Sequence, residues 1–116
     1  MRRDDAYLLD MLIAAREVVE MNQGLAFQDV VTNQLRQHAT VHLLTVLGEA
    51  ARKVSTECKS AHPEIPWDEI IGMRNRLVHE YFDVPWDRVW NAVTDGVPAI
   101  IPLLEKIIPP EEKPNA

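Results

Sequence analysis

Apolar side chains recur at steps of three and four residues along most of this chain, and this spacing limits the fold more than any other feature of the sequence. Such steps place side chains on one face of an α-helix, whereas a strand needs strict alternation. The first half predicts helices over about 4–21 and about 32–58, with Gly24 ending the first and Thr32 as N-cap of the second. We therefore expect an all-α fold without a sheet, in which the long second helix packs antiparallel to its neighbours.

Two more helices are expected in the second half, because nearly the same six residues occur twice. Segments 65–70 (IPWDEI) and 84–89 (VPWDRV) each place proline at a helix start, where its missing N–H costs nothing. The aspartate that follows complements the helix dipole. The pattern predicts a loop over 60–66, a third helix over about 66–81 and a fourth from 85 onward.

The fourth helix is expected to be interrupted. Pro98 and Pro102 lie inside it, and proline removes a backbone donor and crowds the preceding turn, so a kink or break is predicted near Gly96. We expect one helical domain over 1–108 and a disordered tail over 109–116, which is polar and rich in proline.

Charge and cysteine content narrow the function. The formal net charge is −6, which argues against a general nucleic-acid coat protein but leaves room for an enzyme that holds RNA in one small cationic cleft. Cys58 is the one cysteine, so no intrachain disulfide can form. Because neither a signal peptide nor an apolar run of spanning length is present, we expect a cytoplasmic protein with no membrane partner.

Arg74 is the most informative residue of the third helix. On a helical wheel at roughly 100° per residue, Trp67, Ile70, Val78 and Tyr81 fall within about 40° of Arg74. Arg74 therefore lies in the middle of an apolar face. Since an unpaired buried charge is very costly, Arg74 must be paired, or must lie at an interface or a cleft.

His79 and Asn75 lie on the same helix as Arg74. Arginine offers a planar, permanently charged fork for a phosphate, and histidine exchanges a proton near neutral pH. Together they can cleave RNA without a metal: His79 activates the ribose 2′-hydroxyl or protonates the leaving oxygen, and Arg74 stabilises the charge on the phosphorane. The competing interpretation is an ordinary structural ion pair, which is common for residues at this spacing.

The run 72–81 (GMRNRLVHEY) resembles the HepT signature of the HEPN superfamily: an arginine, a polar residue, three more residues, a histidine, any residue and a tyrosine. Segments 65–67 and 48–51, the first helix and the segment around Phe27 are similar to the family too. The resemblance covers roughly 4–108.

The resemblance implies a four-helix up-and-down HEPN bundle that forms a homodimer, with the Arg74 and His79 motifs of two protomers in one cleft. It implies an endoribonuclease toxin acting on RNA, with no DNA substrate and no cofactor. It also implies an MntA-type nucleotidyltransferase antitoxin, which silences the toxin by adding AMP to the motif tyrosine, here Tyr81. Many relatives carry other polar residues where this chain has His38 and the segment 42–45 (HLLT), so we expect the catalytic histidine to be oriented differently here.

Several alternatives stay open. The chain can be a non-catalytic HEPN subunit that holds nucleotide or RNA for the nucleotidyltransferase, or a helical dimerisation module without a ligand. His38, His42 and Glu49 form a polar stripe that can bind a metal, although a seam supporting Arg74 or His79 fits the spacing better. Two larger sets have a structural interpretation: Trp67, Trp86 and Trp90 as core, and Arg36, Arg52, Lys53, Lys59 and Arg88 as solvated surface rather than an RNA path.

Overall fold

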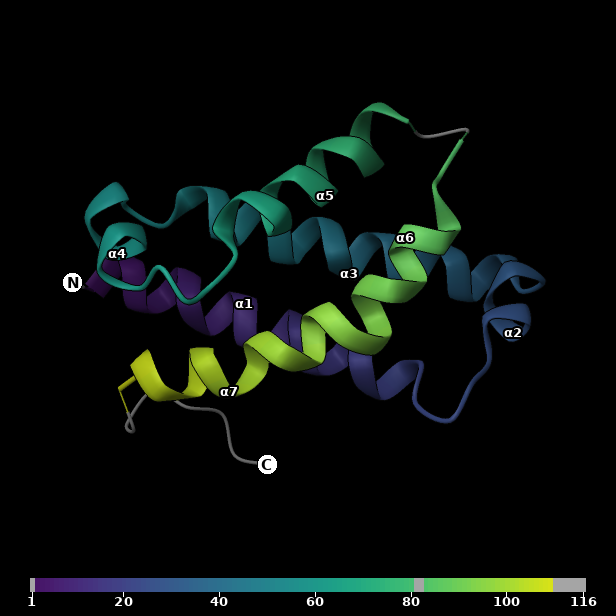
Figure 1. Cartoon of the computed structure of the whole chain (residues 1–116), viewed down its shortest axis with the longest axis horizontal. Helices are drawn as coiled ribbons and strands as arrows, with labels where there is room; N and C mark the ends of the chain where they lie inside the picture. The colour runs from purple at the N-terminus through teal and green to yellow at the C-terminus, as the bar shows by residue number, and fades with distance from the viewer. Residues whose placement is uncertain (1, 81–82, 110–116) are drawn as a thin grey trace.

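The computed structural model describes residues 2–80 and 83–109, and every regular element in these ranges is helical (Figure 1). The elements are α1 Arg2–Met21, α2 Phe27–Val31, α3 Gln34–Lys53, α4 Thr56–Ala61, α5 Trp67–His79, α6 Trp86–Asn91, the π-helical turn η1 Ala92–Gly96 and α7 Val97–Ile107. The expected all-α fold is confirmed over the described residues.

Helix α3 lies at the centre, packed against α1 on one side and α5 on the other (Figure 1). Asp4 near the start of α1 contacts Ser55 just beyond the end of α3, and Asn22 just beyond α1 contacts Thr40 in the first half of α3. These contacts make α1 and α3 antiparallel, as predicted. The segments α1, α3, α5 and α6–α7 alternate in direction, which is the up-and-down order of a helical bundle (Figure 1).

The core is aliphatic and draws on all four segments. Leu8 and Leu12 of α1, Leu44 of α3, Leu77 of α5 and Leu104 of α7 are each at most 3 % exposed. Burying a side chain of this size contributes about 1.5–3 kcal/mol. The core therefore fixes where the middle of α5 crosses α3, and that crossing positions the residues of interest.

The second helix is shorter than predicted. It ends at Lys53 because Val54 is extended, with φ −64° and ψ 140°. Ser55 then caps α4 through a hydrogen bond from the Cys58 N–H, and Asp4 accepts hydrogen bonds from the Ser55 N–H at 2.9 Å and from its hydroxyl at 2.6 Å. The single helix predicted over 32–58 is thus two helices, α3 and α4, and the buried carboxylate of Asp4 stabilises the turn between them.

The start of that helix also differs from the prediction. Asn33, rather than Thr32, is the N-cap of α3, and its side-chain oxygen accepts a hydrogen bond from the Arg36 N–H at 3.1 Å. Gly24 has a φ of +78°, a left-handed value that suits glycine, and so ends the first helix as expected. The short helix α2 between them has no counterpart in the predicted helices.

The predicted break near Gly96 is a wide turn inside a continuous helical rod. The Val97 N–H donates to the Ala92 carbonyl, a step of five residues that is typical of a π-helix. Pro98 follows at the start of α7, where a missing donor is tolerated. Figure 1 shows the rod changing direction between α6 and α7. Pro66 and Pro85 are the N-caps of α5 and α6 rather than their first residues, so each helix begins one residue later than predicted.

Helix α5 ends at His79, before the predicted end near residue 81. The tail expected over 109–116 lies outside the described residues except for Pro109. No helix among the described residues is both long and apolar enough to cross a membrane.

Candidate active site

Arg74 lies where α5 crosses α3, and Gly48 allows the two helices to come this close. A Cβ atom added to Gly48 would lie 2.2 Å from Arg74 Cβ and 3.1 Å from the Ile70 carbonyl oxygen. Trp67 and Leu77 on the same face of α5 are buried. The predicted placement of Arg74 on an apolar face is therefore confirmed, and its side chain is 25 % exposed at the edge of the packed interface.

The Arg74 guanidinium is paired on both terminal nitrogens. Nη2 lies 3.1 Å from Glu49 Oε2, and Nη1 donates to Asn75 Oδ1 at 2.8 Å. Nε is buried and makes no hydrogen bond to any described residue. A guanidinium has five N–H donors, one on Nε and two on each terminal nitrogen. Each terminal nitrogen uses one donor here, so each keeps one for a ligand. Arg74 is thus held in one orientation and can still bind an oxyanion.

Glu49 connects Arg74 to a second arginine. Its carboxylate accepts hydrogen bonds from Arg52 Nη2 at 2.6 Å and Arg52 Nε at 3.3 Å. The hydrogen bond from Arg52, followed by the charges of Arg52, Arg74 and Lys53, holds the pKa of Glu49 below its usual value, against an opposing effect of burial. The same hydrogen bond raises the pKa of Arg52. Two guanidinium groups share one carboxylate, so the cluster keeps an excess of positive charge.

His79 and Asn75 lie on the exposed side of α5. His79 is the last residue of the helix, and both side chains are exposed. Within the described ranges, no hydrogen bond joins His79 to Arg74, whose partners are Glu49 and Asn75. The structure therefore places the two motif residues on one helix, with no hydrogen bond between them in the described part of the chain. Tyr81, the predicted site of AMP addition, lies outside the described residues.

A cavity of about 510 Å³ adjoins the C-terminal end of α5. It is lined by Gln34, Gln37, His38, Val41 and His42 of α3, Leu77 of α5, and Val84 and Trp86 beyond α5. Trp67 is buried as expected, and Trp86 is half-buried but packs against the core, so the prediction that all three tryptophans are core is wrong only for Trp90, which is half-buried and contacts Phe27 edge to face. Trp86 also presents part of its surface to this cavity.

The polar stripe on α3 borders two cavities rather than one metal site. His42 reaches both the cavity at the end of α5 and a second one of about 290 Å³ between α1 and α3, which Thr45 and Glu49 also line. Among the described residues, no three His, Cys, Asp or Glu side chains converge as metal ligands. Glu49 is committed to two arginines, which supports the interpretation of the stripe as a seam behind Arg74.

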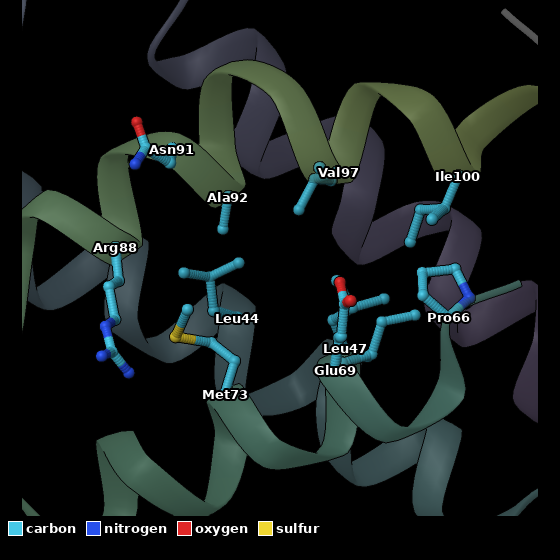
Figure 2. Close-up of a pocket in the computed structure, with 12 residues that line it drawn as sticks. Leu44, Leu47, Pro66, Glu69, Met73, Arg88, Asn91, Ala92, Val97 and Ile100 are labelled. Atoms are coloured by element: carbon cyan, nitrogen blue, oxygen red, sulfur yellow. The ribbon is translucent and has the colours of Figure 1, made fainter.

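A separate cavity of about 290 Å³ lies between α5 and the α6–α7 rod, with α3 behind it in the view of Figure 2. Leu44 and Leu47 line its α3 side and Met73 its α5 side, facing Ala92 and Val97 across the space (Figure 2). Arg74, Asn75 and His79 do not line it. It is therefore distinct from the candidate active site.

Most of the basic residues considered for an RNA path already have structural partners. Arg36 donates to the Met21 carbonyl, Arg52 pairs with Glu49, and Lys59 donates to the Arg52 carbonyl at 3.3 Å. Lys53 Nζ lies 5.8 Å from the centre of the Tyr7 ring. These contacts support the interpretation of the residues as structural surface.

The family model described as ribonuclease HepT-like matches residues 11–107. The chain belongs to this ribonuclease family. This membership agrees with the endoribonuclease class and the HEPN resemblance inferred from the motif. No solved structure matches the chain.

Three similar proteins extend the comparison. "Probable ribonuclease HepT" of Thermococcus cleftensis is 33 % identical, over 87 % of this chain and 92 % of its own length. A "Putative RNase" of Methanocaldococcus jannaschii is 32 % identical, over 82 % of this chain and 87 % of its own. Another "Putative RNase", from Caldanaerobacter subterraneus subsp. tengcongensis, is 30 % identical, over 97 % of this chain and all of its own.

Two participants in the site were missed from the sequence. Gly48 was noted as part of a family-like segment, but its role as the crossing point was not predicted. The available signal was a glycine inside a long helix, where glycine costs about 1 kcal/mol relative to alanine and usually has a packing reason. Arg52, three residues after Glu49, was considered as solvated surface or part of an RNA path but not as a partner of Glu49, although that spacing brings the two side chains together on a helix.

Proposed function

We propose that this chain is a metal-independent endoribonuclease and acts as the toxin of a toxin–antitoxin pair, with Arg74 and His79 as its catalytic residues. The proposal rests on how the Arg74 side chain is held and on the hydrogen-bond donors that it keeps free. Its side chain is fixed by Glu49, Asn75 and the close crossing at Gly48, yet it keeps free donors at a partly exposed edge. A guanidinium held in this way is suited to a phosphate that gains charge during a reaction.

The proposed reaction uses the RNA's own 2′-hydroxyl as nucleophile. His79 takes the proton of this hydroxyl, and the oxygen attacks the adjacent phosphorus. Arg74 donates hydrogen bonds to the oxygens of the five-coordinate phosphorane, while Asn75 keeps the guanidinium in place. The bond to the 5′-oxygen then breaks, and a protonated histidine gives that oxygen its proton. The products are a 2′,3′-cyclic phosphate and a 5′-hydroxyl.

A homodimer would bring two such motifs into one cleft. Two apolar side chains on the helices expected at the interface are unusually open: Leu35 of α3 is 83 % exposed and Val78 of α5 is 45 % exposed. Val78 directly precedes His79, so an interface that covers Val78 would border the catalytic histidine. A domain of this size also gains stability from association.

The decisive experiment compares purified wild-type protein with His79→Ala on single-stranded RNA in EDTA. We expect the wild type to cut and to leave a cyclic phosphate, detected by mass spectrometry of the fragments. The variant should be slower by about a hundredfold to ten-thousandfold, with an unchanged circular dichroism spectrum, because it loses a proton-transfer group and little buried volume. Cleavage by His79→Ala at the wild-type rate would favour the alternative, a non-catalytic subunit that binds nucleotide or RNA.

The proposed antitoxin is an MntA-type nucleotidyltransferase that transfers AMP to Tyr81. A bulky anion beside the cleft would repel RNA phosphates. After co-expression with such an enzyme, mass spectrometry should find the added mass on the peptide that contains Tyr81. The internal control is Tyr7, which is half-buried beneath Lys53 and should stay unmodified. Modification of Tyr7 alone, or of neither tyrosine, would contradict the regulatory part of the proposal.

A further inference from the structure

The cavity at the end of α5 has two walls of different chemistry. Gln34, Gln37 and His38 on successive turns of α3 supply amide and imidazole groups. Leu77 and Trp86 face them with apolar and aromatic surface. The amide and imidazole groups of these side chains can both donate and accept hydrogen bonds along this side of the cavity. A planar ligand with a hydrogen-bonding edge and an aromatic face matches both walls.

Its position relates the cavity to the candidate active site. Leu77 lies two residues before His79 on α5, and Val84 and Trp86 lie on the segment that follows the helix. Arg74, by contrast, contacts α3 further along, at Gly48 and Glu49. A nucleotide whose phosphate is near Arg74 and His79 would have its neighbours within reach of the cavity.

We propose that this cavity is a nucleobase pocket for one nucleotide of single-stranded RNA, a proposal that rests on the proposed ribonuclease function. The base stacks on the indole of Trp86. Its edge is hydrogen-bonded by the amides of Gln34 and Gln37 and by His38. Single-stranded RNA is commonly recognised in this way, by stacking on aromatic side chains and hydrogen bonding to exposed base edges. The pocket would give the enzyme a preference among sequences that a contact with phosphate alone cannot give.

The test measures how much a base contributes to binding, and it does not require cleavage. The parent protein is His79→Ala, so that RNA stays intact. Fluorescence anisotropy gives the Kd for short labelled homopolymers of A, U and C, and for a strand of equal length without bases. In the parent, at least one homopolymer should bind on the order of tenfold more tightly than the abasic strand.

Substitutions of residues that line the pocket should abolish the difference in affinity between the homopolymer and the abasic strand. In the parent background, Gln37→Ala and Trp86→Leu should each bring the homopolymer close to the abasic strand, while the affinity for the abasic strand stays the same. The matched control is Gln28→Ala, an exposed glutamine on α2 outside the cavity, which should keep the tenfold difference. Circular dichroism and light scattering verify that each variant keeps its fold and oligomeric state.

Three results would overturn the pocket: a parent that does not distinguish base-bearing from abasic strands, a base contribution that survives both substitutions, or a variant whose oligomeric state changes. The last result would mean that a second copy of the chain fills the cavity. Failure of the ribonuclease function would appear separately, as absence of cleavage by the wild-type protein.

Discussion

The middle and the end of α5 hold the two halves of one motif, and the two differ in burial. Arg74 in the middle is three-quarters buried, paired with Glu49 and Asn75, and pressed against Gly48. His79 at the end is exposed. A group that must meet a phosphate in a fixed orientation benefits from rigid support, whereas a group that exchanges protons needs access to substrate. The difference implies that substitutions in the middle of α5 affect both stability and activity, and substitutions at its end affect activity alone.

Replacing Arg74 should produce the largest combined effect. In Arg74→Ala, loss of the phosphate contact should slow RNA cleavage by about a hundredfold to a thousandfold. Loss of the side chain from the crossing should also lower the free energy of unfolding by about 1–3 kcal/mol. Rates on a defined RNA and urea denaturation at one protein concentration measure the two effects.

Two further variants sharpen this comparison. Arg74→Lys should recover part of the stability but little of the rate, because a point charge does not replace a planar fork. Arg76→Ala, on the same helix and partly exposed, is the matched control and should change both quantities only slightly. An Arg74→Ala protein that loses activity with unchanged stability would remove the proposed distinction between the two parts of α5.

Gly48 tests the support beneath Arg74 without removing any catalytic group. In Gly48→Ala the new Cβ would lie 2.2 Å from Arg74 Cβ, so α3 and α5 must separate. Such overpacking costs typically about 1–3 kcal/mol, and the shift of Arg74 should lower the cleavage rate as well.

The matched control is Gly72→Ala, also within a helix, where the new Cβ would meet nothing within 4 Å. Alanine there should stabilise the protein by about 0.5–1 kcal/mol through helix propensity and leave cleavage unchanged. Equal destabilisation by both substitutions would show that the close approach at Gly48 is unimportant.

The residues that the sequence predicted well are those whose positions depend on one helix. Arg74 was assigned to an apolar face, with a need for a partner, from helical spacing alone. The interrupted last helix followed from Pro98. Both conclusions use local geometry, which a single sequence contains.

The residues that were missed depend on two elements at once. The end of α3 at Lys53 reflects the contact of Asp4 with Ser55, which are distant in sequence. The cavity beside Trp86 is formed by α3, α5 and the segment after α5, so the periodicity of one segment could not show that this tryptophan also lines a cavity. Gly48 has its role only because Ile70 and Arg74 pack over it. Tertiary contacts of this kind have no counterpart in the spacing of one segment.

The smallest expected effect concerns the charge of Glu49. Its folded pKa lies below the usual 4.5, first because of the hydrogen bond from Arg52 and then because of the charges of Arg52, Arg74 and Lys53. A carboxyl group with a depressed folded pKa stabilises the protein above its unfolded pKa, and this contribution is lost as the pH falls through the folded value. Glu49→Gln keeps the shape of the side chain and removes the charge. The variant should therefore melt slightly below wild type at pH 7, and the two should converge as the pH falls below 4.5.

Melting temperatures at a series of pH values and one protein concentration test this expectation, with Glu69→Gln as the control because Glu69 is exposed on α5. Other acidic groups titrate alike in both proteins and cancel in the difference. Cleavage by Glu49→Gln at pH 7 should stay within about tenfold of wild type, since Arg74 keeps its contact with Asn75 and its packing on Gly48. A difference in melting temperature that widens at low pH would reverse the sign derived for Glu49. A much larger loss of activity would mean that its charge, rather than the helix crossing, holds Arg74 in place.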